Sequence, residues 1–381
     1  MPHDLILTHA RVVLAGETLE DGTVVVRDGV ITDISAGPTS VANAHDLDGD
    51  FLLPGLVEVH TDNLERHVMP RPRVSFPMDS AMQSHDAEIA AAGITTVFDA
   101  IGVGDPYGDG FRSRDQSALL EVLDRLEAVG VLRAEHLIHV RCELPAGNAR
   151  ELFEPFARHP RLALISLMDH TPGQRQWTDP EHARIYYTGK KGWSAAQFER
   201  ELSLAPERQA QHAEPNRQWF AGYAREHGVA LATHDDTTTA HVDEAVALGA
   251  SMSEFPTTLG AARRAREHGL STVAGAPNVV RGGSHSGNVA ALDLEREGLL
   301  SGLSSDYVPG SLLQAAWQLR RLAGLSTSQA IALASSGPAR ACGLHDRGEI
   351  RPGLRGDLVR VVQVGRVPAV REVWRGGRRV A

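Results

Sequence analysis

Several short apolar runs, spread over more than half of the chain, each end in a side chain that metal ions favour. The residues are His60, Asp62, Glu143, His234 and Asp306. An α/β barrel gathers the C-terminal ends of its parallel strands at one mouth, so residues far apart in sequence can meet there. Imidazole and carboxylate groups without a thiolate suit a hydrolytic divalent metal ion. The pattern therefore predicts a barrel that carries a metal-dependent hydrolase site.

His60 and Asp62 are two residues apart on a predicted strand, so both side chains point to the same face and can share one ion. Taken alone, such a pair is explained as well by a hydrogen-bonded turn, and the repetition at other strand ends carries the argument. Glu143 can bridge two ions through its two carboxylate oxygens. Asp306 can bind a metal and also accept a proton from the attacking water, so it is the candidate catalytic residue. An Asx-turn before Tyr307 would explain Asp306 too.

Three further residues at predicted strand ends either bind the metal or hydrogen-bond to residues that do. Asp169 and His170 follow the fourth predicted strand, residues 162–168. Glu254 lies at the end of the sixth, residues 251–255.

A glycine-rich stretch after the seventh predicted strand, residues 275–288, predicts a phosphate site. Its glycines let the backbone approach an oxyanion, and phosphates often bind at this place in a barrel. A glycine loop that binds nothing is the plainer explanation, but the neighbouring arginine and hydroxyl groups favour phosphate. The candidate residues are Arg281, Gly282, Gly283, Ser284 and His285, with Arg71 and Arg73 from the stretch after the first strand. Arg141 and Arg175 are weaker candidates, because a lone basic residue is usually solvated.

Both ends of the chain predict a small β-sandwich domain beside the barrel. Strand-like runs flank Asp28-Gly29 and Gly376-Gly377, and such dipeptides favour hairpin turns. Between the ends, apolar runs alternate with helical periodicity, which predicts a (β/α)8 TIM-like barrel, an α/β fold. The predicted division is residues 1–53 with 345–381 for the β domain and 54–344 for the barrel. An insertion at about 171–226, in which prolines interrupt a helical region, either covers the barrel mouth or forms a peripheral hairpin.

The composition limits the partners of such a protein. A formal net charge of −10 argues against a nucleic-acid partner, which needs a basic face. No apolar run is long enough to span a membrane, and the first residues lack a secretory signal, so we expect a cytoplasmic protein. Cys142 and Cys342 have no metal-binding spacing and fit reduced thiols.

Longer motifs add a resemblance to a known superfamily. Residues 52–60 (LLPGLVEVH) and 348–358 (GEIRPGLRGDL) resemble amidohydrolases. Five further stretches resemble one family within it, the α-D-ribose 1-methylphosphonate 5-triphosphate diphosphatases (PhnM family) of carbon–phosphorus lyase pathways. These stretches are VHTDN at 59–63, AMQSHD at 81–86, SLMDH with PGQRQ at 166–176, THDD at 233–236, and GAPN with RGGSHSGN at 275–288.

The resemblance implies a phosphonate-pathway hydrolase that acts on a ribose phosphonate triphosphate, releases pyrophosphate and leaves the 5-phosphate. It also implies one or two divalent ions per chain, for which Zn, Mn and Fe are equally suited. The sequence departs from the superfamily pattern, because His60-Thr61-Asp62 stands where a His-x-His pair is usual. No lysine follows the fourth strand, so Glu143 is the natural substitute bridge, and Glu254 stands where histidine is common.

Two alternatives and several questions stay open at this point. The same ligand set would serve a deaminase or deacetylase of a cyclic amide or amino sugar. A non-catalytic barrel that scaffolds a lyase complex is the alternative outside the hydrolases. The residues do not settle metal identity and number, the phosphorus that is attacked, selectivity at the 1-phosphonate, or whether the protein is a homodimer.

Overall fold

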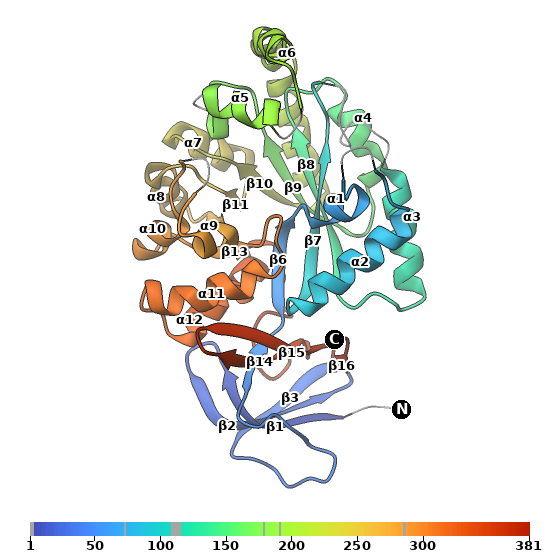
Figure 1. Cartoon of the computed structure of the whole chain (residues 1–381), viewed down its shortest axis with the longest axis vertical. Coiled ribbons are helices and arrows are strands. Elements are labelled where there is room, and N and C mark those ends of the chain that lie inside the picture. Colours follow the sequence, from blue (N-terminus) through green and yellow to red (C-terminus); the bar gives the residue numbers. More distant parts are fainter. Residues whose placement is uncertain (1–3, 72–73, 108–115, 178–179, 190–191, 285–286) are drawn as a thin grey trace.

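Two eight-stranded sheets organise the chain in the computed structural model, which describes residues 4–71, 74–107, 116–177, 180–189, 192–284 and 287–381. One sheet forms the barrel and the other is built from both chain ends, which Figure 1 shows beneath it. The predicted α/β barrel and its terminal β unit are therefore confirmed. Within the described residues, no helix is long and apolar enough to cross a membrane.

The terminal sheet joins segments from the two ends of the chain. Its strands are β1 (Leu5–Val13), β2 (Thr18–Arg27), β3 (Val30–Ala36), β4 (His45–Asp46), β5 (Phe51–Pro54), β14 (Leu358–Val364), β15 (Val367–Arg375) and β16 (Arg378–Arg379). The order is β16-β15-β14-β5-β1-β2-β3, and β4 pairs with β1. The strand β5 therefore connects the two halves, because it pairs with β14 on one side and with β1 on the other.

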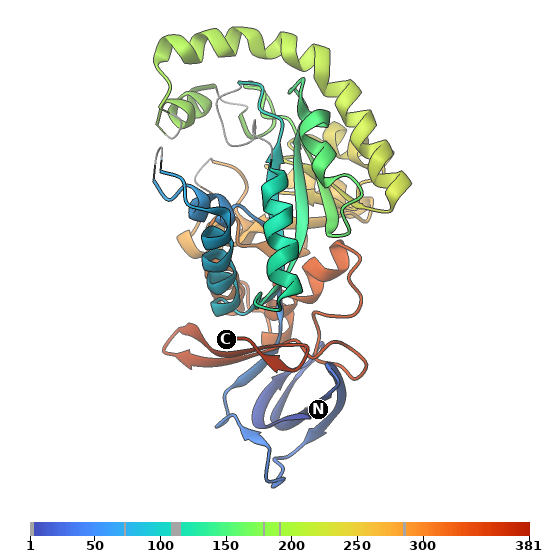
Figure 2. The ribbon, with the colours of Figure 1, turned by 90° about the vertical axis from the view of Figure 1, so that its right-hand side faces the viewer.

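The predicted hairpin between β2 and β3 is present. Asp28 and Gly29 have φ values of 48° and 81°, the left-handed conformations that such a tight turn requires. The sheet folds over on itself, so that Val24 of β2 and Trp374 of β15 belong to one buried cluster. Figure 2 shows the β14–β15 hairpin lying across the N-terminal strands, which gives the unit its sandwich-like packing.

The barrel contains eight strands in sequential order, and all of the pairs within it are parallel. They are β6 (Leu56–Thr61), β7 (Ile94–Val103), β8 (Glu135–Glu143), β9 (Leu162–Met168), β10 (Ala230–His234), β11 (Met252–Glu254), β12 (Ser271–Gly275) and β13 (Gly302–Ser304). A parallel bridge between Thr61 and Asp306 closes the circle from β13 back to β6 at the C-terminal end.

The apolar run at 51–59 that precedes His60 is divided at Gly55 between two strands, β5 and β6. The backbone N–H of Gly55 donates to the carbonyl of Asp357 at 2.8 Å, and at this point the chain passes from the terminal sheet into the barrel. A Cβ atom on Gly55 would lie 2.2 Å from Oγ1 of Thr95, so only glycine fits between the two sheets.

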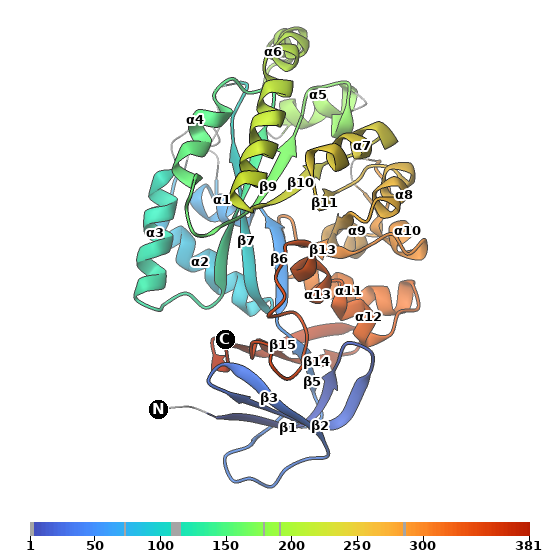
Figure 3. The same cartoon turned by 180° about the vertical axis from the view of Figure 1, so that it is seen from behind.

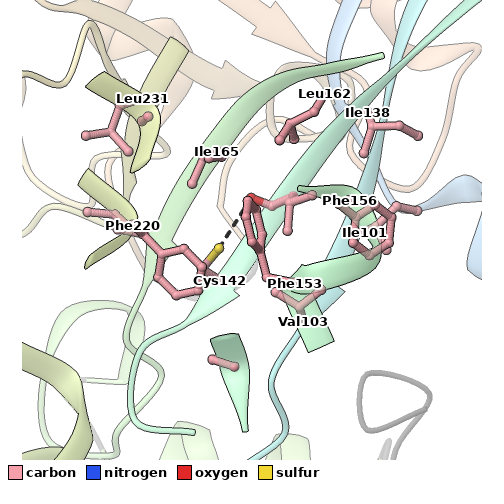
Figure 4. Packing of buried hydrophobic residues seen from close by; sticks show 14 of the residues in the cluster. Ile101, Val103, Ile138, Cys142, Phe153, Phe156, Leu162, Ile165, Phe220 and Leu231 are labelled. Carbon is pink, nitrogen blue, oxygen red and sulfur yellow. Dashed lines mark hydrogen bonds between the residues drawn. The ribbon is translucent and has the colours of Figure 1, made fainter. Parts of the chain in front are cut away.

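Helices form a layer around the barrel, as Figures 1 and 3 show. They are α1 (Asn63–Val68), α2 (Met78–Ala91), α3 (Ser117–Ala128), α4 (Ala149–Phe153), α5 (Pro180–Gly189), α6 (Ala195–His227), α7 (Thr239–Leu248), α8 (Leu259–Glu267), α9 (Ala276–Arg281), α10 (Ala291–Arg296), α11 (Ser311–Leu322), α12 (Thr327–Ala332) and α13 (Ser336–Ala341). The outer faces of β8 and β9 bury residues against α3, α4 and α6. Phe153, Phe220 and Cys142 belong to this cluster, part of which Figure 4 shows. Cys142 and Cys342 are both free thiols.

The helix α6 corrects one prediction, because it runs without interruption through Pro206 and Pro215. Proline removes one hydrogen bond and crowds the preceding turn, so a long helix bends at such residues when packing holds both of its ends. Phe198 packs into an aromatic cluster with Trp193, and Phe220 packs against the barrel wall. Figure 2 shows α6 bowed across the C-terminal end of the barrel strands and down one side.

Candidate metal centre

His60 occupies the centre of the barrel mouth, on β6, with 1% of its surface exposed. Its Nδ1 lies 3.2 Å from Oε1 of Glu254, and its Nε2 lies 4.0 Å from Oδ1 of Asp62. One ligand atom each of His60, Asp62 and Asp306 come within 4.8 Å of one another, and we call these residues the His60 group. Burial lowers the pKa of His60, so its ring is neutral near pH 7 and able to coordinate a cation.

Asp306 faces Asp62 because the barrel closes between their backbones. The N–H of Asp62 donates to the carbonyl of Asp306 at 3.0 Å, and the Thr61 hydroxyl donates to the same oxygen at 2.7 Å. Asp306 has a φ of 55°, a left-handed conformation that aspartate tolerates better than most residues. These bonds fix the direction from which the Asp306 carboxylate enters the mouth.

Glu58, which the sequence analysis did not identify, stabilises the same junction between β6 and β13, below His60. Its carboxyl group accepts hydrogen bonds from the backbone N–H of His60 at 2.7 Å and of Ser305 at 2.5 Å. The hydroxyl of Ser304 lies 2.8 Å from the same group. Burial raises the pKa of Glu58 to about 7, although these hydrogen bonds oppose the shift. Glu58 thus links β6 to the end of β13 through its side chain, beside the backbone bridge between Thr61 and Asp306.

Alternate residues of β8 point into the barrel. Ile138, Val140 and Cys142 pack outward among the helices, so His139, Arg141 and Glu143 face inward at successive levels. His139 is the deepest: its Nε2 lies 2.8 Å from Oγ of Ser166 and 3.7 Å from Oε2 of Glu254. Burial lowers the pKa of His139 to about 3, so it too is neutral.

A second group of three ligand-type residues adjoins the first. His170, His234 and Asp235 also bring one ligand atom each within 4.8 Å of one another, and we call them the His234 group. The ring centroids of His234 and His60 are 5.5 Å apart, so the two groups are neighbours. Burial opposes protonation of His234, but the Asp235 carboxylate at 2.6 Å outweighs it and raises the pKa of His234. Glu143 joins through His170, whose Nδ1 lies 2.6 Å from Glu143 Oε2.

Some of the predicted metal ligands lie together in the structure and others do not. The structure brings His60, Asp62 and Asp306 together and places His234 beside them, and Glu254 and His170 also belong to groups of three. Within the described residues, Glu143 and Asp169 belong to none of these groups. Asp169 instead accepts hydrogen bonds from the Thr171 N–H at 3.1 Å and from Gln209 of α6 at 2.8 Å.

Two buried atoms test whether these residues suit a metal ion. Among the described residues, Nε2 of His234 and Oε2 of Glu254 have no hydrogen-bond partner. Buried polar atoms are rarely left unpaired, and imidazole nitrogens beside carboxylate oxygens form a donor set that divalent ions prefer. The donors at the mouth therefore fit a divalent metal.

Comparison with known proteins decides the family. Residues 87–381 match the model described as "Amidohydrolase family". The alpha-D-ribose 1-methylphosphonate 5-triphosphate diphosphatase of Escherichia coli (strain K12) is 44% identical over 99% of this chain and 100% of its own length. The chain belongs to the amidohydrolase family. An imidazolonepropionase of Deinococcus deserti is 27% identical over 95% of this amidohydrolase and 92% of its own length. A solved structure of molinate hydrolase, 15% identical with a TM-score of 0.67, covers 99% of this chain and 94% of its own, and shows the same fold.

In this amidohydrolase, the predicted phosphate stretch is partly helical rather than a loop. Pro277 lies in the first turn of α9, where proline is tolerated, and Gly282 ends the helix with a φ of 86°. Arg281 and Gly282 are exposed, whereas Gly283 and Ser284 are half-buried. Of the other candidates, Arg71 is exposed, and Arg73 and His285 lie outside the described residues.

Another cluster of imidazoles and carboxylates lies behind the barrel wall of this amidohydrolase, between α2, β7 and β8. Asp99 lies 2.7 Å from Nε2 of His85 and 2.8 Å from Nδ1 of His136. The remaining ring nitrogens also have partners, Asn63 for His85 and Asp86 for His136. We call these five residues the wall network. Because hydrogen bonds engage all four ring nitrogens, the network supports the barrel wall and the turn after Asp62 rather than an ion.

Proposed function

We propose that this amidohydrolase hydrolyses α-D-ribose 1-methylphosphonate 5-triphosphate to the 5-phosphate and pyrophosphate, in phosphonate breakdown. The observation that carries the proposal is 44% identity, over both full lengths, to the E. coli diphosphatase of that name. The buried imidazoles and carboxylates at the barrel mouth provide the chemistry that such a hydrolase needs. Water attacks one phosphorus of the triphosphate, and a phosphoanhydride bond breaks.

We propose that one or two divalent ions, of Zn, Mn or Fe, bind at this mouth. His60, Asp62, His234 and Asp306 would hold them, with Glu143 as a bridging carboxylate. His170 and Glu254 either join them or orient the ligands through the hydrogen bonds described above. A divalent ion held there would activate water near neutral pH and neutralise phosphate charge.

Asp306 acts as the proton acceptor in this proposal. Its backbone is fixed by Thr61 and Asp62, which holds the carboxylate in one direction at the mouth. A proton leaves the attacking water as the new phosphorus–oxygen bond forms, and a carboxylate in this position can take it. Arg281 and Gly282–Ser284, with Arg71, would contact the outer part of the triphosphate.

The surroundings of the reaction follow from its substrate. We place the reaction in the cytoplasm, because a triphosphate is too highly charged to cross a membrane unaided. The net charge of −10 disfavours a nucleic-acid partner. A homodimer is compatible with the chain, and sedimentation velocity would decide between one and two copies.

Phosphorus NMR of the purified, metal-loaded protein with the ribose triphosphate tests the function. We expect one pyrophosphate and one 5-phosphate per substrate, with the Asp306→Asn variant as the inactive control. Release of single orthophosphate would contradict a diphosphatase. Ammonia or a new carboxylate with an intact triphosphate would favour the deaminase or deacetylase instead.

A further inference from the structure

Arg141 is a buried cation inside the barrel mouth. It lies on β8 between the inward-facing His139 and Glu143, and 6% of its surface is exposed. Its Nη1 lies 2.5 Å from Oδ1 of Asp62. A sequence interpretation that treats a lone arginine as solvated is therefore wrong for this residue.

The guanidinium of Arg141 makes only part of its possible hydrogen bonds within the described residues. Asp62 is its hydrogen-bond partner in the described part of the chain, through Nη1, and the buried Nε–H has none there. Nε and Nη2 form one edge of the planar group, with two parallel donors that match two oxygens of a phosphate. A buried polar donor without a partner is costly, so an occupant that accepts hydrogen bonds is expected at this edge.

The contacts of Arg141 place its guanidinium beside a residue proposed to hold metal, because its Nη1 bonds to Asp62. The carboxylates of Glu65 and Asp306 also act on the guanidinium charge, so three acidic residues surround it. Arg141 is therefore an electrostatic neighbour of the residues proposed to hold metal.

The other buried arginine at this end of the barrel provides a useful contrast. Arg175 donates to the carbonyl of His234 at 3.1 Å and to Asp236 at 2.9 Å, and Glu244 lies 3.6 Å away. The bonds of Arg175 to the protein explain its burial. Within the described residues Arg141 has only its hydrogen bond to Asp62, which does not explain the burial of the other donors. Arg281 and Arg71, two of the arginines predicted to bind phosphate, are exposed.

We propose that Arg141 is a catalytic residue that binds a substrate phosphate inside the barrel through its Nε–Nη2 edge, while Asp62 holds it in place. This inference rests on the proposed function and names the inner phosphate ligand of the same site. Hydrolysis breaks a P–O–P bond and leaves negative charge on the departing pyrophosphate. The two N–H groups stabilise that charge by donating hydrogen bonds, without transferring a proton.

Calorimetric binding of inorganic pyrophosphate to the protein as purified tests the proposal without turnover. Arg141→Lys keeps the charge and its attraction to Asp62 but loses the two-pronged edge. We expect it to weaken pyrophosphate binding at least tenfold, on the order of one lost charged hydrogen bond. Arg141→Gln should weaken it further, and kcat/KM for the triphosphate should fall in parallel. Arg263→Gln is the matched control, because Arg263 is exposed and pairs with Glu297.

Metal content and melting temperature, measured on each variant, separate a phosphate contact from a structural role. Unchanged metal content and stability in Arg141→Lys, together with weaker pyrophosphate binding, would support the proposal. Wild-type affinity for pyrophosphate in a folded Arg141→Lys or Arg141→Gln protein would overturn it. Failure of the wild-type protein to cleave the triphosphate would instead contradict the proposed function, and the pyrophosphate titration would still decide the role of Arg141.

Discussion

The wall network makes a quantitative prediction about stability. Burial alone would lower the pKa of His136, but Asp99 and Asp86 raise it from an ordinary 6.5 to about 9. Each pKa unit is worth about 1.4 kcal/mol, so protonated His136 stabilises the fold by about 3 kcal/mol. Because the folded pKa is the higher one, this contribution is complete below about pH 6.5 and is lost as the pH rises through about 9.

Replacing Asp99 by asparagine removes the charge that binds both imidazoles but preserves the shape. We expect Asp99→Asn to lower the free energy of unfolding by about 3–5 kcal/mol at pH 6.5, since it leaves His136 with one fewer counter-charge in a buried site. The difference from the wild type should shrink by more than half at pH 9.5, where His136 is largely neutral in both proteins. Urea unfolding, followed by tryptophan fluorescence at pH 6.5, 8 and 9.5, measures both values.

A surface aspartate with similar partners provides the control. Asp243 pairs with Arg264 at 2.7 Å and with His268 at 3.4 Å, but 49% of its side chain is exposed. Asp243→Asn should cost less than about 1 kcal/mol at every pH. An Asp99→Asn loss that is the same at pH 6.5 and 9.5 would refute the reasoning, because it would show that His136 carries no charge that depends on Asp99.

Three shorter predictions concern the mouth. Asp306→Asn should keep the metal content and fold of the wild type but lower kcat by at least about 100-fold, and near-normal hydrolysis would remove Asp306 from the mechanism. Glu58→Ala should lower the free energy of unfolding by about 2–5 kcal/mol, because the N–H groups of His60 and Ser305 lose their acceptor. Glu58→Gln keeps one acceptor oxygen and should lower the free energy of unfolding by less. Equal melting temperatures for the two variants would contradict this prediction. Dialysis against a chelator should abolish turnover and lower the melting temperature, and adding Zn, Mn or Fe should restore both. Full activity without metal would exclude the proposed metal centre.

Local signals predicted most of the fold. The turn at Asp28-Gly29 is present because only residues that tolerate left-handed conformations fit there. Alternating apolar runs placed the barrel strands, since each run must be buried on both faces. The division at Gly55 was not visible, because it depends on Thr95 and Asp357, which are distant in sequence. The continuity of α6 also depends on packing at its ends rather than on its own residues.

In the candidate site, too, the residues that local patterns could not predict are those whose contacts are distant in sequence. Strand ends are recognisable in sequence, so His60, His234 and Asp306 were found by position. Glu58 lies within a strand, and its hydrogen bonds cross to β13, so no local pattern marks it. The inward alternation of β8 could have identified His139 beside Glu143, because the two are four residues apart. Their roles towards a metal stay predictions.

The pairing of β5 with β14 has a consequence for synthesis on the ribosome. Pro54 lies opposite Leu358, so one edge of β5 gains its neighbour only after the whole barrel has been translated. Domains usually fold as they emerge, and an edge strand without a partner is prone to join a foreign strand. The nascent chain therefore has an unpaired edge strand, β5, through most of its translation. A premature stop codon before β14 would leave β5 permanently unpaired on that edge, and the truncated protein would be prone to aggregate.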